Sequence, residues 1–280
     1  MEILRYAAFT SDPAGGNPAG VVLDAGPATV TDMQQTAAAV GYSETAFLVP
    51  QGADGDFDVR YFSPLAEVPF CGHATIAAAV AYAERHGAGE LSFRTAAGLV
   101  RVVTTAGPDG PTATLTSVTP HVEALGNDDL ARLLTALRLS VDDLDPSLPP
   151  RVAFGGAYHP IIAIATRERL AALDYHFDML RVLMAERDWT TVDLVWRESA
   201  TVFRARNPFP PGGVVEDPAT GAAAAAFGGY LRTLGLVELP ADLTIYQGDD
   251  LGRPSVLRVH LGVDADSGIQ VSGTAVAITP

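Results

Sequence analysis

The sequence predicts an α+β protein made of two similar halves, and three observations indicate it. Strand-like runs outnumber helical ones along most of the chain. Two segments made almost wholly of alanine, glycine and apolar residues are typical of helices, at about 73–86 and 220–233. Each follows a strand-like run, FDVRYF or TVFRAR, and an acidic loop. Because a helix that is apolar on every side must be buried, we expect one buried helix in each half, with both N-termini facing a shared cleft.

The first half opens with the strand LRYAAFTS, followed by the Gly/Pro loop GGNPAGVVLD, which runs into a second strand. TDMQQTAAAVG is typical of a short helix, with Thr31 as its cap and Gly41 at its end. ETAFLVP and FDVRYFSP alternate as strands do. After the first alanine-rich helix, Gly and Pro turns separate three further strands, LSFRTA, GLVRVVTT and TATLTS.

The second half begins with the crossover segment HVEALGNDDL, where Asn127 is expected to cap the helix DDLARLLTALRL. The Pro-rich DPSLPPR ends this region, and AYHPIIAIAT is typical of a strand. RERLAAL and FDMLRVLMAE predict helices, and TVDLVWR and ATVFRARN predict strands. After the second alanine-rich helix, three strands close the chain: LTIYQG, SVLRVHLG and GIQVSGTAVAI.

Composition excludes several classes of protein. Among 280 residues, 18 basic and 33 acidic side chains give a net charge of −15, which argues against a nucleic-acid partner because phosphate binding needs clustered Lys and Arg. The single cysteine, Cys71, allows no internal disulfide and fits a reducing compartment. The sequence has no basic start followed by an apolar run and no stretch of about 20 apolar residues. We therefore expect a soluble cytoplasmic protein without a membrane contact.

Signatures of cofactor and metal enzymes are missing from the sequence. It contains no G-x-x-x-x-G-K-[ST], no G-x-G-x-x-G, no H-E-x-x-H and no G-x-S-x-G motif. Its six histidines show no metal-ligand spacing. We therefore expect no metal and no organic cofactor, and a chemistry that depends on side-chain acids and bases alone.

Three candidate residues lie at the first alanine-rich helix and at the strand ETAFLVP. Glu44 begins an otherwise apolar strand, where partial desolvation suits a carboxylate for acid/base work; the alternative is an ordinary strand-edge Glu. His73 opens the first alanine-rich helix, where backbone amides can bind an anion and an imidazole titrates near neutrality; the alternative is a structural residue at a helix start. Cys71, beside Gly72, is either a thiol activated by the helix N-terminus or a small buried apolar residue.

Further candidates lie at the second alanine-rich helix and in the first loop. Asp217 precedes Pro218 at the helix start and is a candidate site residue; the alternative is a helix cap, for which Asp before Pro is a common pattern. Thr220, Gly221 and Ala222 form the mouth of this helix, where small residues let a ligand carboxylate approach the amides, unless they serve only tight packing. Asn17 lies in a Gly-Asn-Pro turn that either lines the same cleft or is a plain loop.

Four motifs together resemble the PhzF-like proteins, a family named for a phenazine biosynthesis isomerase: GNPAGVVL, SETAF, FSPLAEVPFCGHAT and EDPATGAAAAAFGGYL. The resemblance covers nearly the whole chain in the family's order. It implies the fold of diaminopimelate epimerase, with two similar lobes, each a curved, mostly antiparallel sheet around a central helix, and the active site in the cleft between them. The expected lobes are 1–120 and 121–267, with 268–280 returning to the first.

The resemblance also implies roles for the candidate residues. Glu44 matches the family's proton-shuttling glutamate, and His73 and Asp217 match the residues that help to hold substrate and tune its protonation. The backbone amides of Gly72–His73 and Gly221–Ala222 match positions expected to bind a carboxylate. Ala222 departs from the pattern, because many members carry Ser there, and this puts the identity of the substrate in doubt.

The implied function is a cofactor-independent isomerase that moves a proton within a small unsaturated, diene-type carboxylic or amino acid, in secondary metabolism such as antibiotic biosynthesis. A homodimer is implied as well. Diaminopimelate epimerase itself is excluded because it needs two cysteines and this chain has one. Two alternatives stay open: an amino-acid epimerase or racemase on the same scaffold, with Cys71 or Asp217 opposite Glu44, and a non-catalytic protein that binds a ligand.

Overall fold

A computed structural model of the chain describes residues 1–108 and 110–279. Contacts between residues divide it into two compact units. The first unit comprises Met1–Thr116 and Ser272–Pro280, and the second comprises Ser117–Val271. Pro280, the last residue of the segment 268–280 that the resemblance assigns to the first lobe, lies outside the described residues.

The first unit is a sheet that closes on itself. Its strands are β1 (Leu4–Ala8), β2 (Asn17–Val22), β3 (Glu44–Pro50), β4 (Asp56–Phe62), β5 (Glu67–Val68), β6 (Glu90–Thr95), β7 (Gly98–Thr105), β8 (Thr112–Thr116) and β17 (Gln270–Ala277). Pairing runs from β4 through β3, β2, β1, β17, β8, β7 and β6 and returns to β4, while β5 adds to β4. The pairs β2–β3 and β4–β6 are parallel. A parallel pair needs a crossover, and the helices α1 (Val30–Val40) and α2 (Gly72–His86) lie in these two connections.

The second unit has a sheet of its own. Its strands are β9 (His121–Ala124), β10 (Arg151–Phe154), β11 (Tyr158–Ala163), β12 (Asp193–Arg197), β13 (Val202–Pro208), β14 (Glu216–Asp217), β15 (Ala241–Gln247) and β16 (Ser255–Leu261). They pair in the order β9–β10–β11–β12–β13–β15–β16, and β14 adds to β13. The helices are α3 (Asn127–Ala136), α4 (Arg167–Ala171), α5 (Phe177–Arg187) and α6 (Gly221–Thr233), with short 3-10 turns at Val141–Asp143, Pro210–Gly212 and Asp249–Leu251.

The sequence echo corresponds to a repeated topology. In the first unit β3 and β4 are antiparallel, β5 adds to β4, α2 follows, and β6 returns parallel to β4. In the second unit β12 and β13 are antiparallel, β14 adds to β13, α6 follows, and β15 returns parallel to β13. Each alanine-rich helix is therefore the crossover of a parallel strand pair, which is why both follow a strand and an acidic loop.

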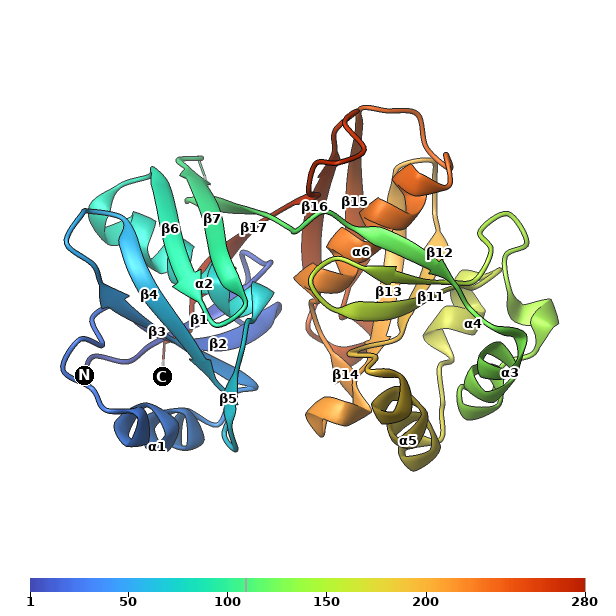
Figure 1. Cartoon of the computed structure of the whole chain (residues 1–280), viewed down its shortest axis with the longest axis horizontal. Helices are drawn as coiled ribbons and strands as arrows, with labels where there is room; N and C mark the ends of the chain where they lie inside the picture. The colour runs from blue at the N-terminus through green and yellow to red at the C-terminus, as the bar shows by residue number, and fades with distance from the viewer. Residues whose placement is uncertain (109, 280) are drawn as a thin grey trace. The chain divides into compact units, whose positions relative to one another are not determined.

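The two alanine-rich helices lie against the sheets of their own units (Figure 1). α2 contacts β1, β2, β3, β7 and β8, and α6 contacts β9, β10, β11 and β16. Small side chains let the neighbouring backbone come close: a Cβ added to Gly155 would lie 2.6 Å from the backbone nitrogen of Ala226 in α6. The predicted burial of both helices is confirmed, because His73–Ala83 of α2 and Ala223–Arg232 of α6 are all buried.

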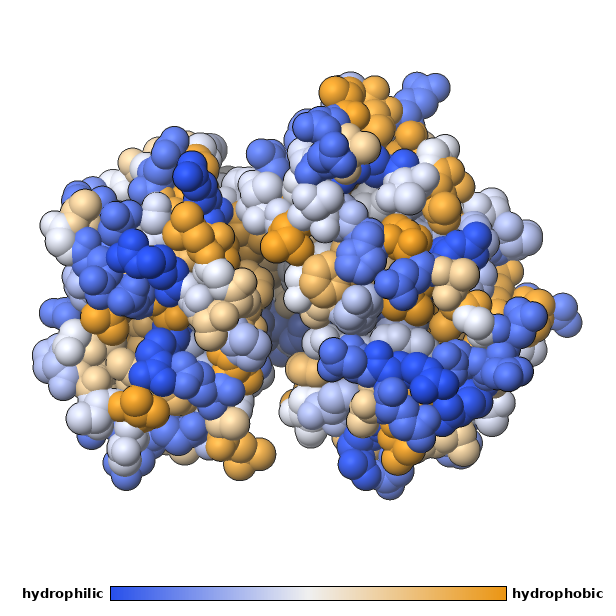
Figure 2. Space-filling model, viewed as in Figure 1, coloured by the Kyte–Doolittle hydropathy of each residue, from blue (hydrophilic) through white to orange (hydrophobic). Residues whose placement is uncertain are grey.

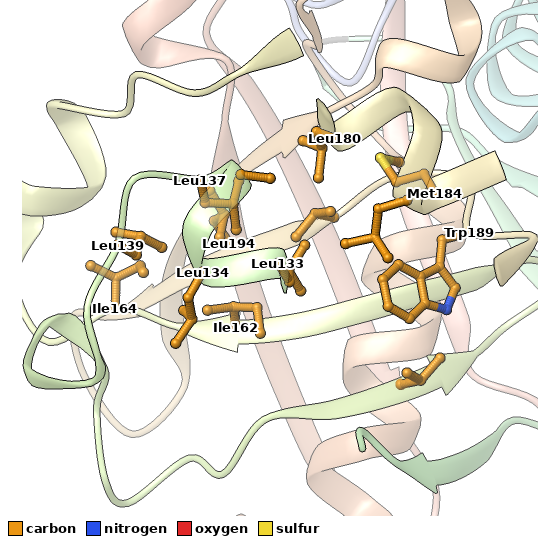
Figure 3. Close-up of a cluster of buried hydrophobic side chains, with 14 of the residues drawn as sticks. Leu133, Leu134, Leu137, Leu139, Ile162, Ile164, Leu180, Met184, Trp189 and Leu194 are labelled. Atoms are coloured by element: carbon orange, nitrogen blue, oxygen red, sulfur yellow. The ribbon is translucent and has the colours of Figure 1, made fainter. Parts of the chain in front are cut away.

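A second core in the second unit lies where α3 and α5 pack on β11 and β12 (Figure 3). Leucine, isoleucine and methionine side chains meet there, together with Trp189. Leu133, Leu180 and Met184 are fully buried. Since these helices, unlike α6, keep one face in solvent, only one stripe of each is apolar.

Leu180→Ala is expected to lower the free energy of unfolding by about 2–5 kcal/mol, because it removes buried methyl groups and leaves a cavity. Met179, its neighbour in α5, is 49% exposed, so Met179→Ala is the matched control and should stay within about 0.5 kcal/mol of the parent protein. Urea denaturation of the two variants tests the expectation. Equal losses for both would mean that the cluster does not carry the stability assigned to it.

Several local predictions are wrong in instructive ways. The cap of α1 is Thr29 and not Thr31, because Thr29 and Asp32 exchange the two hydrogen bonds of a capping box, one between the Thr29 side chain and the Asp32 N–H. α1 does end at Gly41, which has positive φ. Asn127 is the first residue of α3 rather than its cap; Gly126 holds that place and makes no side-chain bond.

Short strands in the loops escaped prediction. β9 lies in the segment interpreted as a crossover, β10 begins at Arg151, the last residue of the Pro-rich segment, and the two-residue strands β5 and β14 lie in the acidic loops. Asn17, expected in a turn, is the first residue of β2 and pairs with Ala8. Periodicity cannot show a strand of two to four residues, so these pairings appear only when the partner strand is known.

The surface visible in Figure 2 is mostly hydrophilic, and hydrophobic residues occur on it in several small groups. Exposed apolar side chains such as Leu65, Val141 and Val263 are spread along the sequence, as is normal for a protein surface. Within residues 1–108 and 110–279, no helix has the length and apolarity that crossing a membrane requires.

Candidate active site

Three side chains predicted as site residues meet in the first unit. Glu44 begins β3, Cys71 is the residue before α2, and His73 lies in the first turn of α2. Glu44 Oε2 lies 3.5 Å from His73 Nε2 and 3.6 Å from Cys71 Sγ, and Cys71 Sγ lies 3.3 Å from His73 Nδ1. The Glu44 side chain is 15% exposed and that of His73 is 7% exposed. A carboxylate, a thiol and an imidazole therefore share one largely desolvated place.

Buried hydrogen bonds hold the turn that enters α2. The hydroxyl of Thr75 donates to the Cys71 carbonyl at 2.7 Å, so it accepts the hydrogen bond from the Tyr61 hydroxyl, 2.6 Å away. Both Tyr61 and Thr75 are fully buried, and burial raises the pKa of Tyr61, which keeps this hydroxyl a neutral donor. The backbone that carries Cys71 and His73 is thereby fixed from inside the sheet.

Ser43 was not predicted as a site residue, although it precedes Glu44 in the SETAF motif. Its Oγ lies 3.4 Å from His73 Nε2, the same nitrogen that faces Glu44. Two oxygens thus compete for one ring nitrogen, and which one it serves depends on the tautomer of the ring. The motif contained this residue, but only the tertiary contact shows that it touches the imidazole.

The first-unit cluster also has a donor set that a metal could use. One ligand atom each from Glu44, Cys71 and His73 lies within 4.8 Å of the others. Carboxylate, thiolate and imidazole together suit Zn²⁺. The three side chains could thus serve as ligands of a cation, although the sequence analysis expects no metal.

The second unit gathers the other predicted residues at the start of α6. Thr220, the residue before the helix, donates from Oγ1 to Asp217 Oδ2 at 2.6 Å. Asp217 lies in β14, three residues before the N-cap Thr220, so it is not the N-cap that one interpretation of the sequence gave. Gly221 and Ala222 are the first two residues of α6, and Thr220 is buried.

Gln247, at the end of β15, was missed by the sequence analysis and ties this group together. Its Nε2 donates to the Asp217 carbonyl at 2.7 Å and to Thr220 Oγ1 at 3.0 Å, and its Oε1 accepts from the Thr220 N–H at 3.1 Å. The side chain is only 2% exposed. A glutamine at the end of a predicted strand carries no signal of its own; its role depends on the parallel pairing of β15 with β13.

Gln247→Ala is expected to lower the free energy of unfolding by about 1–3 kcal/mol, because it leaves the buried Thr220 N–H without its acceptor. Faster amide hydrogen exchange at Thr220 and the first residues of α6 should accompany the loss. Gln270→Ala is the control, since Gln270 is exposed. Unchanged amide exchange around Thr220 in the Gln247 variant would show that the Gln247 hydrogen bonds do not hold this segment.

The helix starts of α2 and α6 share a feature that suits an anion. Neither has a side-chain cap, which is also true of α3 and α5, whereas α1 is capped by Thr29 and α4 by Thr166; unlike α3 and α5, neither α2 nor α6 has an acidic residue in its first turn. The first N–H groups of a helix have no partner within the helix, and together with the helix dipole they attract negative charge. Each unit therefore offers one buried helix start at which a carboxylate could bind.

Asn17 lies near the first-unit cluster by register. It is 1% exposed and starts β2, two residues before Ala19, which pairs with Glu44. The structure thus brings together Glu44, Cys71 and His73 in one unit, with Gly72 between the last two, and Asp217, Thr220, Gly221 and Ala222 in the other.

Comparisons with known proteins agree along almost the whole chain. A sequence model of the family described as "Phenazine biosynthesis-like protein" matches residues 6–279. The uncharacterized isomerase YddE of Escherichia coli (strain K12) is 33% identical in an alignment of 288 residues. The alignment covers 99% of this chain and 96% of the relative. The trans-2,3-dihydro-3-hydroxyanthranilate isomerase of Pseudomonas chlororaphis is 32% identical over 279 residues, covering 96% of this chain and 94% of the relative.

A solved structure shows the same fold. The Bacillus anthracis phenazine biosynthesis protein of the PhzF family superimposes with a TM-score of 0.88 at 26% sequence identity. The superposition covers 100% of this chain and 98% of the other.

Proposed function

The chain belongs to the family of phenazine biosynthesis-like proteins, and on that premise we propose that it moves a proton between carbons of a small unsaturated carboxylic or amino acid. Relatives that match nearly its full length are named isomerases, and this chain is an isomerase of the same family. The observation that supports the finer proposal is the position of Glu44, largely desolvated and within 3.6 Å of Cys71 and His73.

Glu44 is proposed as the proton shuttle. Its carboxylate removes a proton from one carbon, and the electron pair of the broken C–H bond enters the conjugated system of the substrate. The same carboxyl group then returns the proton to another carbon of that system, so the product is an isomer and no electron is gained or lost. General acid–base transfer of this kind suits a carboxyl group that is partly withdrawn from water.

The remaining site residues are proposed to hold the substrate. Backbone amides at Gly72–His73 and Gly221–Ala222 are suited to a carboxylate, and they can stabilise negative charge that develops on it during the transfer. His73 contacts Glu44 and is placed to tune its protonation. Asp217 is proposed to hold a polar group of the substrate, while Ala222 offers a backbone amide without a hydroxyl.

The substrate test uses trans-2,3-dihydro-3-hydroxyanthranilate, the compound in the name of a relative. Incubation in heavy water, followed by proton NMR, should show a shifted double bond and the new C–H position, with deuterium entering only to the extent that Glu44 exchanges with solvent. Deuterium at a stereocentre without a double-bond shift would indicate an epimerase instead. If neither change appears with this compound or with other cyclic diene acids, the proposed reaction is wrong.

We also propose that the protein is a homodimer that serves secondary metabolism, such as the formation of an antibiotic building block. This proposal derives from the resemblance to the family. Light scattering of the purified protein tests the oligomeric state, and a mass of one chain across the concentration range would contradict it.

A further inference from the structure

A chain of four buried polar side chains lies in the second unit, outside the residues assigned to the site. His159 comes from β11, Thr191 from the segment before β12, Asp193 from β12 and Asn207 from β13. None is more than 2% exposed. The links are His159 Nδ1 to Thr191 Oγ1 at 2.8 Å, Thr191 Oγ1 to Asn207 Oδ1 at 2.7 Å, and Asn207 Nδ2 to Asp193 Oδ1 at 3.1 Å.

The direction of this chain follows from the number of protons available. Thr191 donates its only hydroxyl proton to Asn207 Oδ1, so it must accept from His159, and the proton of the imidazole sits on Nδ1. Nε2 of His159 then carries a lone pair, and it has no hydrogen-bond partner among the described residues. At the other end of the network, Asn207 Nδ2 donates to Asp193 Oδ1. The Asn207 amide therefore accepts from Thr191 with its oxygen and donates to Asp193 with its nitrogen, which sets the direction of every hydrogen bond in the network.

Asn207 connects this chain to the start of α6. In the antiparallel pair β13–β14, Asn207 is directly opposite Asp217, and side chains of directly opposed residues lie on the same face of a sheet. Arg206 is the preceding residue of β13, so its side chain points to the opposite face. There it forms a buried ion pair with Glu216, the other residue of β14. Glu216 is thus held by Arg206 on one face of β14, and Asp217 lies on the other face, the face of Asn207.

We propose that His159, Thr191, Asn207 and Asp193 form a positioning network for Asp217. The amide of Asn207, clamped between Thr191 and Asp193, fixes the local register and the face on which Asp217 meets the substrate. This inference rests on the proposed function for its kinetic consequence, but not for its structural one. None of the four residues is assigned contact with the substrate.

Burying four polar side chains is unfavourable in free energy, which argues that they have a role beyond packing. Each buried polar group costs free energy unless it is hydrogen-bonded, and His159 Nε2 leaves one cost unmet. Proteins depart from an apolar core in this way mainly at functional sites. Asn207 of the network pairs with β14, the shortest strand of this unit. Because a strand of two residues cannot hold its own register, the network has a position from which it can hold β14 in place.

Thr191→Val tests the network because it keeps the shape of the side chain and removes the hydroxyl in the middle of the chain. Relative to the parent protein, KM for trans-2,3-dihydro-3-hydroxyanthranilate should rise on the order of tenfold, as expected for a misplaced binding group, with little change in kcat. Amide hydrogen exchange should accelerate at residues 207–222 and not elsewhere. Thr191→Ser restores the hydroxyl and should return both values toward those of the parent.

Thr104→Val is the matched control. Thr104 is also buried, and its hydroxyl likewise donates and accepts, with the carbonyl and N–H of Gly89. It lies in the first unit, so this variant should leave KM and the exchange at 207–222 unchanged. If Thr191→Val only lowers stability, with uniform exchange and an unchanged KM, the residue is merely structural and the proposal is overturned.

His159→Phe keeps the test decisive if Thr191→Val does not fold. It replaces a buried ring by a buried ring and removes the unpartnered nitrogen, and it should change exchange at 207–222 in the same direction by a smaller factor. Unchanged exchange there would also overturn the proposal. An inactive parent protein would defeat the proposed function alone, since the exchange measurement needs no substrate.

Discussion

Glu44→Gln is expected to lower kcat for proton transfer by about 10²–10⁴-fold, the range that a positioned acid–base group contributes. The amide has the size of the carboxyl group but cannot take a proton from carbon at neutral pH. Binding should change far less than turnover, because the helix amides proposed to hold the carboxylate are untouched. Proton NMR of the reaction in heavy water gives the rate, and thermal unfolding shows whether the variant is folded.

The control for this variant is Glu90→Gln. Glu90 begins β6 as Glu44 begins β3, but it is exposed, so its loss should leave both kcat and stability within error of the parent. Turnover at the parent's rate by a folded Glu44→Gln protein would end the assignment of Glu44 as proton shuttle. A loss shared equally by both variants would point to a general effect of charge.

The second large effect concerns the pH dependence of stability. Burial raises the pKa of Asp193 from its ordinary 3.8 to about 7, against the opposing effect of the hydrogen bond from Asn207. Burial lowers the pKa of His159 from 6.5 to about 4, opposed by the hydrogen bond with Thr191. Both groups thus stay neutral in the folded protein where the unfolded chain would charge them, and the two act in opposite directions on the pH scale.

The sign of each contribution follows from proton binding. For Asp193, the unfolded chain binds fewer protons than the folded one between pH 3.8 and about 7, so this group makes stability rise as pH falls through that range. For His159, the unfolded chain binds more protons between about pH 4 and 6.5, so this group makes stability fall as pH falls. The full changes correspond to about 4 and about 3 kcal/mol, and in the parent protein they largely offset each other.

Single variants should separate the two contributions. Between pH 7 and pH 4.5, Asp193→Asn should lose about 3 kcal/mol of stability relative to the parent, because the rise in stability that Asp193 supplies over this interval is gone. His159→Phe should instead gain about 2–3 kcal/mol over the same interval. Urea denaturation of the three proteins at both pH values gives these differences, in which the other carboxyl groups cancel. Parallel pH curves for all three would show that neither group is held neutral by burial.

The family, the α+β class and the two buried helices could all be predicted from the amino-acid sequence. The reason is that these features are written in local patterns: an alanine-rich helix without a polar face has only one possible environment, and the motifs that carry the resemblance are contiguous. Glu44, Cys71 and His73 could be named as candidates for the same reason, since SETAF and FCGHAT surround them. The family was then confirmed by the match over residues 6–279.

Which side chains meet could be seen only in the folded protein. Gln247 contacts Thr220 because β15 runs parallel to β13. Asn207 pairs with Asp217 of β14, a strand of two residues that is too short to be recognised from sequence periodicity. His159 and Asp193, which are far apart in sequence, join one hydrogen-bond network with Thr191 and Asn207 because β11, β12 and β13 are neighbours in the sheet. Contacts between strands depend on their register, and the register is set by the packing of the whole sheet. The sequence therefore shows which groups could react, but the contacts of these groups depend on the fold.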